Sequence, residues 1–248
     1  MNEQRKQQVS IVDRLCKFKF KRRCRKRYWI GALALVVLVL GVFHAPLLRL
    51  VASVLIADER PPEHVDAIAV AQGDEVLATG IEQFQNGNAE SILLFQTIAR
   101  RVTSIGVLPA PEEYYRDRLT EMGIDDRLII TLSSNDRKGE WREAHLIDNW
   151  LRENSDKQVV ILCPRFDSRR IRMTIDRVLP ADRRENVTVQ GIARHSCDET
   201  NWWHSREGWK AVFYCYVDLS YDWVYGEDEE AFPQWDPDEF ESQLSESI

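Results

Sequence analysis

The chain lacks the sequence patterns of the most common catalytic and metal sites. It has no C-x-x-C pair, which disfavours a zinc ribbon or a thioredoxin-type redox centre. It has no G-x-S-x-G motif and no G-x-G-x-x-G motif, which disfavours a nucleophile-elbow hydrolase and a standard dinucleotide-binding loop. His195, Cys197 and His204 do not have the spacing of metal ligands, so we predict no metal site. No pattern indicates a particular cofactor.

Cysteine is scarce as well, with five in 248 residues. Cys16 and Cys24 lie near the N-terminus, whereas Cys163, Cys197 and Cys215 lie in the larger remainder. An odd number of thiols leaves a disulfide among these three open and unassigned. Cys163 ends an apolar run, which is typical of a residue in a hydrophobic core.

Charge of one sign is absent from the C-terminal end of the chain and rare at the N-terminal end. Residues 227–248 contain nine acidic residues and no Lys or Arg, which predicts an acidic disordered tail. Its aromatic residues are candidates to dock on the domain or on a partner: Phe232, Trp235 and Phe240. Residues 1–28 contain eleven Lys or Arg and two acids, a net charge of +9. Since the total is −7, the rest of the chain carries −16, and the two parts are expected in different environments.

Polar side chains are absent from the fifteen residues WIGALALVVLVLGVF, which begin at Trp29. Continued to Leu48, this run has the length of a helix about 30 Å long, the thickness of the hydrocarbon core of a bilayer. We predict a transmembrane signal anchor over residues 29–48. A cleaved signal peptide is the alternative, but small residues are poorly placed near the end of the run.

The basic flank of the anchor predicts its orientation. Positive charge stays inside, so residues 1–28 are expected in the cytoplasm and the main domain outside it, after a juxtamembrane lead-in over residues 49–64. The lipid bilayer is therefore a predicted partner. Topology and contact with anionic lipid explain the basic tail, so we predict no nucleic-acid binding.

Apolar strands and amphipathic helices alternate along the remaining chain. Strands are predicted at 65–72, 91–96, 128–132, 159–163 and 186–192, and helices at 75–84, 112–122, 140–152, 168–179 and 209–224. Nearly continuous apolar strands with helical crossovers predict an α/β domain over residues 65–226. We expect a Rossmann-like three-layer fold whose mainly parallel sheet has about five strands, preceded by the one transmembrane helix. Ligands should bind where the strands end and the helices begin.

The stretch PRFDSRRIR is the strongest candidate site in those loops. Arg165, Arg169 and Arg170 cluster where an apolar strand passes into a helix N-terminus. Backbone N–H groups and guanidinium groups at such a place favour an anion: phosphate, pyrophosphate or a carboxylate. The alternative is a solvated helix face on which Asp167 caps the helix and pairs locally with the arginines.

Other loop residues are candidates for the same pocket. Gly73, Asn135 and Trp203 are predicted to bind the ligand, because each follows a predicted strand. Glu143 and Asp74 are the candidate catalytic carboxylates. Helix capping explains Glu143 equally well, and an ordinary turn explains Asp74.

The stretch NWWHSREGW, residues 201–209, places three tryptophans in and after one loop. Trp202 and Trp203 are suited to stacking on a nucleobase or a sugar, or to filling a gap at the sheet edge. Trp209 is predicted to be buried, on an apolar helix face that also includes Val212, Phe213, Tyr216 and Val217.

The order of these elements resembles the YdcF/SanA/ElyC family of envelope-associated proteins, a domain family mostly of unknown function. The resemblance covers roughly residues 57–226 and rests on ADERPPEHVDAIAVAQG, FQNGNAESILLFQ, YYRDRLTEMGI, SSNDRKGEWREA, VVILCPRFDSRRIR and NWWHSREGWKAVFYCY. The family's first loop is typically Gly-rich and followed by Arg, whereas this chain has Gln72-Gly73-Asp74-Glu75. A histidine common before the double arginine is replaced by Asp167.

Two functions follow from these observations. The resemblance implies a membrane-anchored protein of cell-envelope or surface-polysaccharide biogenesis, and the arginine cluster predicts an anionic ligand resembling a nucleotide or a lipid-linked sugar. Whether the chain is an enzyme stays open. The departures from the family's loops favour the alternative, a non-catalytic membrane scaffold that binds a membrane protein partner.

Overall fold

A computed structural model describes residues 41, 43–57, 59–71, 73–96, 109–133 and 141–226. The predicted basic tail, most of the predicted anchor, Asn135 and the predicted acidic tail lie outside the described residues. The chain divides into two units, residues 1–50 and 51–248, and each is considered by itself. Residues 43–50 of the first unit are helical. Among the described residues, no helix is both long and apolar enough to cross a membrane.

The second unit is built on a five-stranded parallel sheet, as the alternating pattern predicts. The strands are β1 (Val65–Val70), β2 (Ala89–Phe95), β3 (Ile129–Leu132), β4 (Val159–Pro164) and β5 (Val187–Ile192). They lie in the order β3-β2-β1-β4-β5. The chain therefore leaves β1 toward one edge of the sheet and leaves β4 toward the other edge.

Helices connect the strands at nearly the predicted positions. They are α2 (Asp74–Gln85), α4 (Pro111–Glu121), α5 (Arg142–Glu153), α6 (Ser168–Val178), the short α7 (Ala181–Arg184) and α8 (Arg206–Tyr225). Short 3₁₀ turns precede β3, α6 and α8: η1 (Asp126–Leu128), η2 (Arg165–Asp167) and η3 (Trp202–His204). The sequence predicts all the longer helices because each pairs an apolar stripe with turn residues at its ends.

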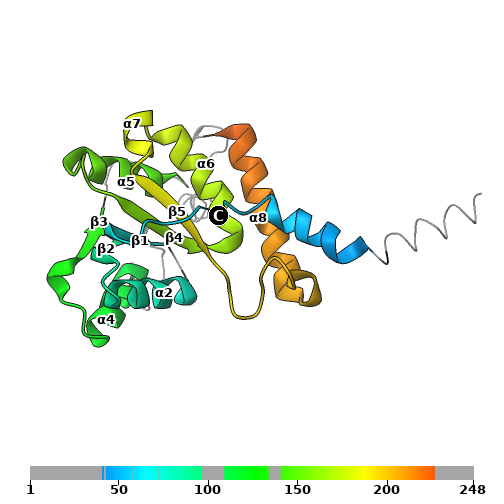
Figure 1. The fold of residues 1–248 in the computed structure, drawn as a ribbon, viewed down its shortest axis with the longest axis horizontal. Helices are drawn as coiled ribbons and strands as arrows, with labels where there is room; N and C mark the ends of the chain where they lie inside the picture. The colour runs from blue at the N-terminus through cyan, green and yellow to red at the C-terminus, as the bar shows by residue number, and fades with distance from the viewer. Residues whose placement is uncertain are drawn as a thin grey trace, which may run out of the picture. The chain divides into compact units, whose positions relative to one another are not determined.

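Apolar side chains on both faces of the sheet form two cores, so helices cover both faces. Ile68 and Val70 point toward α2 and α4, in a core that includes Leu77 and Leu119. Ala67 and Ala69, the alternate residues of β1, point toward α5 and α6. Figure 1 shows these two pairs of helices on opposite sides of the strands. The strands are apolar on both faces because neither face meets water.

Helix α8 packs against α6 and the loops around it, beyond the layer that covers the sheet (Figure 1). Its buried residues are Gly208, Val212, Cys215 and Asp222. The prediction that Trp209 is buried is wrong, because Trp209 is 52% exposed and Phe213 is 63% exposed. Apolar residues surround most of this helix, so the sequence periodicity alone could not identify the inward face.

The loop before α8 explains the tryptophan pair. Trp202 is 2% exposed and fills the space under the helix, and its ring lies 4.8 Å from that of Trp209. A Cβ at Gly208 would lie 2.1 Å from the Trp202 carbonyl oxygen, so only glycine permits this approach. The Ser205 hydroxyl accepts a hydrogen bond from the Gly208 N–H and caps the helix. The motif is therefore a packing device that fixes the start of α8.

The two tryptophans should differ in their effect on stability. We expect Trp202→Ala to lower the free energy of unfolding by about 3–5 kcal/mol, since it removes a large buried ring. Trp209→Ala should cost about 1 kcal/mol, because only a partial ring contact and one hydrogen bond to the Trp203 carbonyl are lost. Denaturant titration of the two variants measures both values. A larger loss for Trp209→Ala would contradict this assignment of the buried face.

Candidate functional site

The strand order makes the carboxyl ends of β1 and β4 the switch point of the sheet, where a crevice is expected. The connections after these adjacent strands run in opposite directions, which is where ligands bind in open α/β sheets. The loop after β4 enters α6 through Arg165, Phe166 and Asp167. This loop and the C-terminal helix α8 bring together most of the charged residues near the crevice.

The main chain of the lead-in occupies the N-terminus of α6. The Arg169 N–H donates to the Leu55 carbonyl at 3.1 Å, and the Arg169 guanidinium donates to the Ile56 carbonyl at 2.9 Å. The Ser168 hydroxyl accepts from the Ala57 N–H at 2.9 Å. These bonds fix the lead-in on the domain. They also occupy the backbone N–H and the guanidinium of Arg169, which were predicted to bind an anion.

Arg165 pairs with a carboxylate from a distant loop. Its Nε donates to one carboxylate oxygen of Glu199 at 2.6 Å, and one terminal nitrogen donates to the other oxygen at 2.6 Å. Both side chains are between a quarter and a third exposed. Such a bidentate pair holds the guanidinium in one plane and offsets its charge. Arg165 is therefore a positioned donor and not an uncompensated cation.

Arg170 belongs to a buried charge network between α6 and α8. Its guanidinium lies 3.5 Å from the Asp222 carboxylate, which is 1% exposed, and 3.9 Å from Asp167. Arg177, about two helical turns after Arg170 on α6, donates to the Asp222 carbonyl at 2.6 Å and lies over the ring of Trp141. Two arginines of α6 thus hold the C-terminal half of α8.

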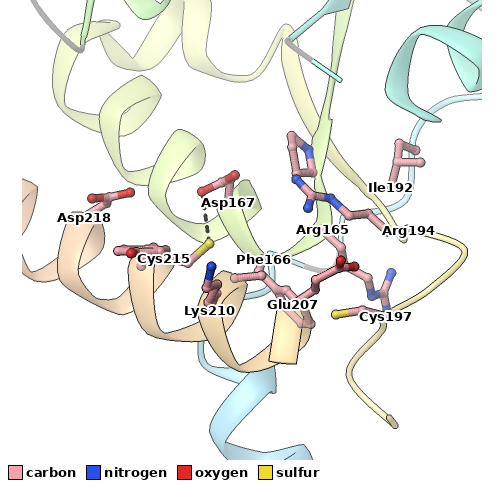
Figure 2. Close-up of a pocket in the computed structure, with 13 residues that line it drawn as sticks. Arg165, Phe166, Asp167, Ile192, Arg194, Cys197, Glu207, Lys210, Cys215 and Asp218 are labelled. Atoms are coloured by element: carbon pink, nitrogen blue, oxygen red, sulfur yellow. Dashed lines mark hydrogen bonds between the residues drawn. The ribbon is translucent and has the colours of Figure 1, made fainter. Parts of the chain in front are cut away.

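A pocket of about 360 Å³ lies between the loop after β4, the end of β5 and the first half of α8. Its charged lining residues are Arg165, Arg194, Lys210, Asp167, Glu207 and Asp218. Figure 2 shows the pocket with Cys215 and Cys197 on opposite sides of it. The volume lies within the range of small-molecule sites. Arg194 and Lys210 form no ion pair and no side-chain hydrogen bond with any residue that the structure describes.

The thiols of the domain are unpaired and buried. Cys163, Cys197 and Cys215 are all free, so no disulfide links them. The Cys215 thiol donates to an Asp167 carboxylate oxygen at 3.3 Å. Burial raises the pKa of the Cys215 thiol, and the nearby Asp167 charge raises it further. The Cys215 sulfur is therefore protonated at neutral pH and is a poor nucleophile.

The two candidate catalytic carboxylates lie in different places. Asp74 is exposed at the start of α2 and borders a groove of about 310 Å³ between α2 and α4. Glu143 lies in the first turn of α5, on the opposite face of the sheet, beside Arg170 and a cavity of about 20 Å³. Burial raises the pKa of the Glu143 carboxyl, Arg170 lowers it in part, and Asp167 raises it. Neither carboxylate lines the 360 Å³ pocket.

Of the predicted ligand residues, Arg165 lines the pocket. Gly73 has a φ of 139° and donates its N–H to the Tyr115 hydroxyl, on the α2 side of the sheet. The Trp203 carbonyl accepts a hydrogen bond from the indole N–H of Trp209. The Trp203 ring packs edge to face against the Trp202 ring. Asn135 lies outside the described residues. The described residues contain no group of His, Cys, Asp or Glu that could hold a metal ion.

The sequence analysis missed four residues that organise this region: Arg194, Glu199, Lys210 and Asp222. Asp222 had a detectable signal, since it continues the spacing of Gly208, Val212 and Cys215 along α8. The other three lie on a loop and on a helix whose packing the sequence does not determine. Comparison with family models, with curated proteins and with solved structures finds no match for the chain.

The raised pKa of Glu143 predicts a dependence of stability on pH. The folded state favours the protonated carboxyl, so its contribution is complete below the usual value of 4.5 and is lost as pH rises through the raised pKa. The melting temperature of Glu143→Gln should therefore equal that of the unchanged protein near pH 4 and exceed it at pH 7. Glu153→Gln, at an exposed position of the same helix, is the matched control. Equal pH profiles for all three proteins would contradict the prediction.

The ion pair between Arg170 and Asp222 predicts a second effect on stability. Arg170→Gln leaves a buried carboxylate without its counter-charge, so we expect the unfolding free energy to fall by about 3–5 kcal/mol. Adding Asp222→Asn should restore most of this loss, because the neutral amide costs less to bury. Denaturant titration of Arg170→Gln, Asp222→Asn and the double variant measures the coupling. Additive losses in the double variant would show that the pair does not act as a unit.

Proposed function

We propose that this chain is a membrane-anchored envelope protein whose Rossmann-like domain binds a small anionic ligand in the pocket beside α8. The single observation that carries the proposal is that two exposed cations without an ion pair among the described residues, Arg194 and Lys210, line one 360 Å³ pocket at the carboxyl ends of β4 and β5. Cations that converge on one pocket favour an anion from solution.

The other lining residues support a ligand that also carries hydroxyl groups. Glu207 and Asp218 supply acceptors but would repel a second anionic group near them. Tyr214 is 59% exposed and offers a ring face at the pocket. A phosphate or pyrophosphate at Arg194 and Lys210, with a sugar or a nucleoside toward Tyr214 and the acids, would satisfy this pattern.

Arg165 would supply a third donor to the same ligand. Glu199 binds its Nε and one terminal nitrogen, which leaves the second terminal nitrogen for a ligand. Because Glu199 fixes the guanidinium plane, little side-chain entropy would be lost on binding. The proposal is one of binding: the Cys215 thiol in the lining donates to the Asp167 carboxylate, but burial and that charge raise its pKa and make it a poor nucleophile.

The sequence supports the location. Residues 29–48 are proposed to anchor the chain in the membrane, with residues 1–28 in the cytoplasm and the domain outside it. The resemblance to the YdcF/SanA/ElyC family is proposed on the motifs quoted above, and it favours a nucleotide-linked or lipid-linked sugar in envelope biogenesis. A lipid-linked ligand would be presented at the surface where the anchor holds the domain.

A non-catalytic scaffold is the second candidate. The internal pairing of Arg165, Arg169 and Arg170 favours it, because each arginine bonds to a residue of the domain itself. In that case the cluster stabilises the fold, and a membrane protein partner would bind another surface. The two candidates differ in whether the pocket responds to an anion.

Ligand-induced stabilisation tests the anion site. Full-length protein in detergent micelles is heated with inorganic pyrophosphate and, separately, with a nucleoside diphosphate sugar. At a hundred times its dissociation constant, a ligand should stabilise the protein by about 2.7 kcal/mol. Arg194→Gln with Lys210→Gln should abolish the rise in melting temperature, because it removes both unpaired cations.

The control for this test is Arg60→Gln with Arg127→Gln. It makes the same change in net charge at two exposed positions that do not line the pocket. The control should respond to ligand as the unchanged protein does. If the two double variants respond alike, or if the unchanged protein responds to neither probe, the binding proposal fails and the scaffold is favoured.

A further inference from the structure

The outward face of α8 carries a row of large apolar side chains that only one small polar residue interrupts. Trp209, Phe213, Val217 and Val224 are 52%, 63%, 48% and 64% exposed, and they follow one another about every fourth residue. These four residues are called the outer stripe. Arg206, one turn before Trp209, and Ser220, between Val217 and Val224, are the other positions of this line, so no acidic residue lies in it. Tyr214 and Tyr221 flank it and are also exposed.

Such a stripe is unusual on the surface of a folded domain. The opposite face of α8 is already buried against α6 and the preceding loop, through Gly208, Val212 and Cys215. Single exposed apolar residues are normal, whereas a continuous row of them marks a surface that contacts something else. A helix that is apolar on two faces is expected to pack on two sides. The stripe is therefore a contact surface.

A hydrogen bond from Tyr216 joins this surface to a residue that follows the proposed anchor closely in the sequence. It lies at the edge of the stripe, and its hydroxyl donates to the Val51 carbonyl at 2.6 Å. Val51 is three residues after Leu48, where the apolar run 29–48 ends. Three residues span at most about 10 Å. The stripe thus begins within a short length of chain from the point at which an anchor would leave the bilayer.

We propose that the outer stripe of α8 lies in the interfacial region of the lipid bilayer. The proposal rests on the membrane anchor of the proposed function. Trp and Tyr are enriched at this depth of a membrane, because an apolar ring and a polar group each meet a suitable environment there. Lys210 and Arg206, also on α8, can reach lipid phosphates. The bilayer would cover the apolar surface that the domain leaves exposed.

Charge disfavours the acidic C-terminal residues as the occupant. Residues 227–248 carry nine acids and no Lys or Arg, and residues 29–226 are also net negative. Docking residues 227–248 on the domain would bring negative charges together. A second copy of this chain would need two stripes to match each other, whereas the anchor brings every copy to a bilayer. We therefore favour lipid over both protein occupants.

The contact would also orient the ligand pocket. Tyr214 and Lys210 line the pocket and belong to the same helix as the stripe. With α8 at the bilayer surface, the pocket would lie beside the lipid headgroups. Such a position suits a ligand whose anionic group is attached to a lipid.

Photo-crosslinking from α8 tests the contact directly. Full-length protein is reconstituted in vesicles of phosphatidylethanolamine and phosphatidylcholine, with p-benzoylphenylalanine in place of Phe213. Tyr114, an aromatic residue 48% exposed on α4, is replaced in the control. After irradiation, mass spectrometry should find lipid attached at position 213 and none at position 114. Attachment to a second copy, attachment to residues 227–248, or no lipid adduct at 213 would overturn the inference.

Two further measurements separate this inference from the anchor. Resistance to extraction by alkaline carbonate reports on residues 29–48 alone, so a protein that is extracted contradicts the anchor. A protein that resists extraction but yields no lipid adduct contradicts only the contact of α8. Val217→Glu adds a charge within the stripe and should abolish the lipid adduct at 213 while resistance to carbonate is kept. An undiminished adduct in this variant would also overturn the inference.

Discussion

The buried ion pair between Arg170 and Asp222 determines where α8 lies, and the candidate site depends on that helix. Asp222 is 1% exposed, so its charge is tolerated only beside a fixed counter-charge. Arg177 adds a bond to the carbonyl of the same residue. At the other end of α8, Gly208 and Trp202 set the distance between the helix and its preceding loop. Both ends of the helix are thus fixed by contacts that few substitutions would keep.

Arginine has two roles around the crevice. Arg169 and Arg170 hold the lead-in and α8 against α6, which is why the predicted anion site at the start of α6 is filled by the protein itself. Arg194 and Lys210 lie beyond that network and face a pocket without a partner among the described residues. The proposed anion site therefore lies beside the predicted position, toward β5 and α8, where three acids also line the pocket.

Hydrogen bonds fix the segment that follows the proposed anchor onto two helices of the domain. The carbonyls of Leu55 and Ile56 bind to Arg169, and the carbonyl of Val51 binds to Tyr216. These bonds join the segment that follows the proposed anchor to both α6 and α8. A domain held in this way would keep one face toward the bilayer, and a lipid-linked ligand would then need little additional reach.

The sequence by itself determined the α/β architecture. Apolar strands at Val65–Val70 and Val159–Pro164, separated by amphipathic helices, have one arrangement that buries both faces, so the parallel sheet and nearly all helix boundaries could be predicted. The burial of Cys163 also followed from its apolar run, whereas its free state did not. The local pattern was sufficient to predict these elements, because residues close in the chain determine which segments are buried.

Only the tertiary structure decided which cations are available and which face of α8 is buried. Arg165 is compensated by Glu199 and Arg170 by Asp222, residues more than thirty positions away, and no spacing rule connects them. The periodicity of α8 fits two apolar faces equally, and the tight approach of Gly208 to the Trp202 carbonyl selects one. Charge pairing and helix packing depend on contacts between residues that are distant in sequence. The candidate site could therefore be located only from the tertiary structure.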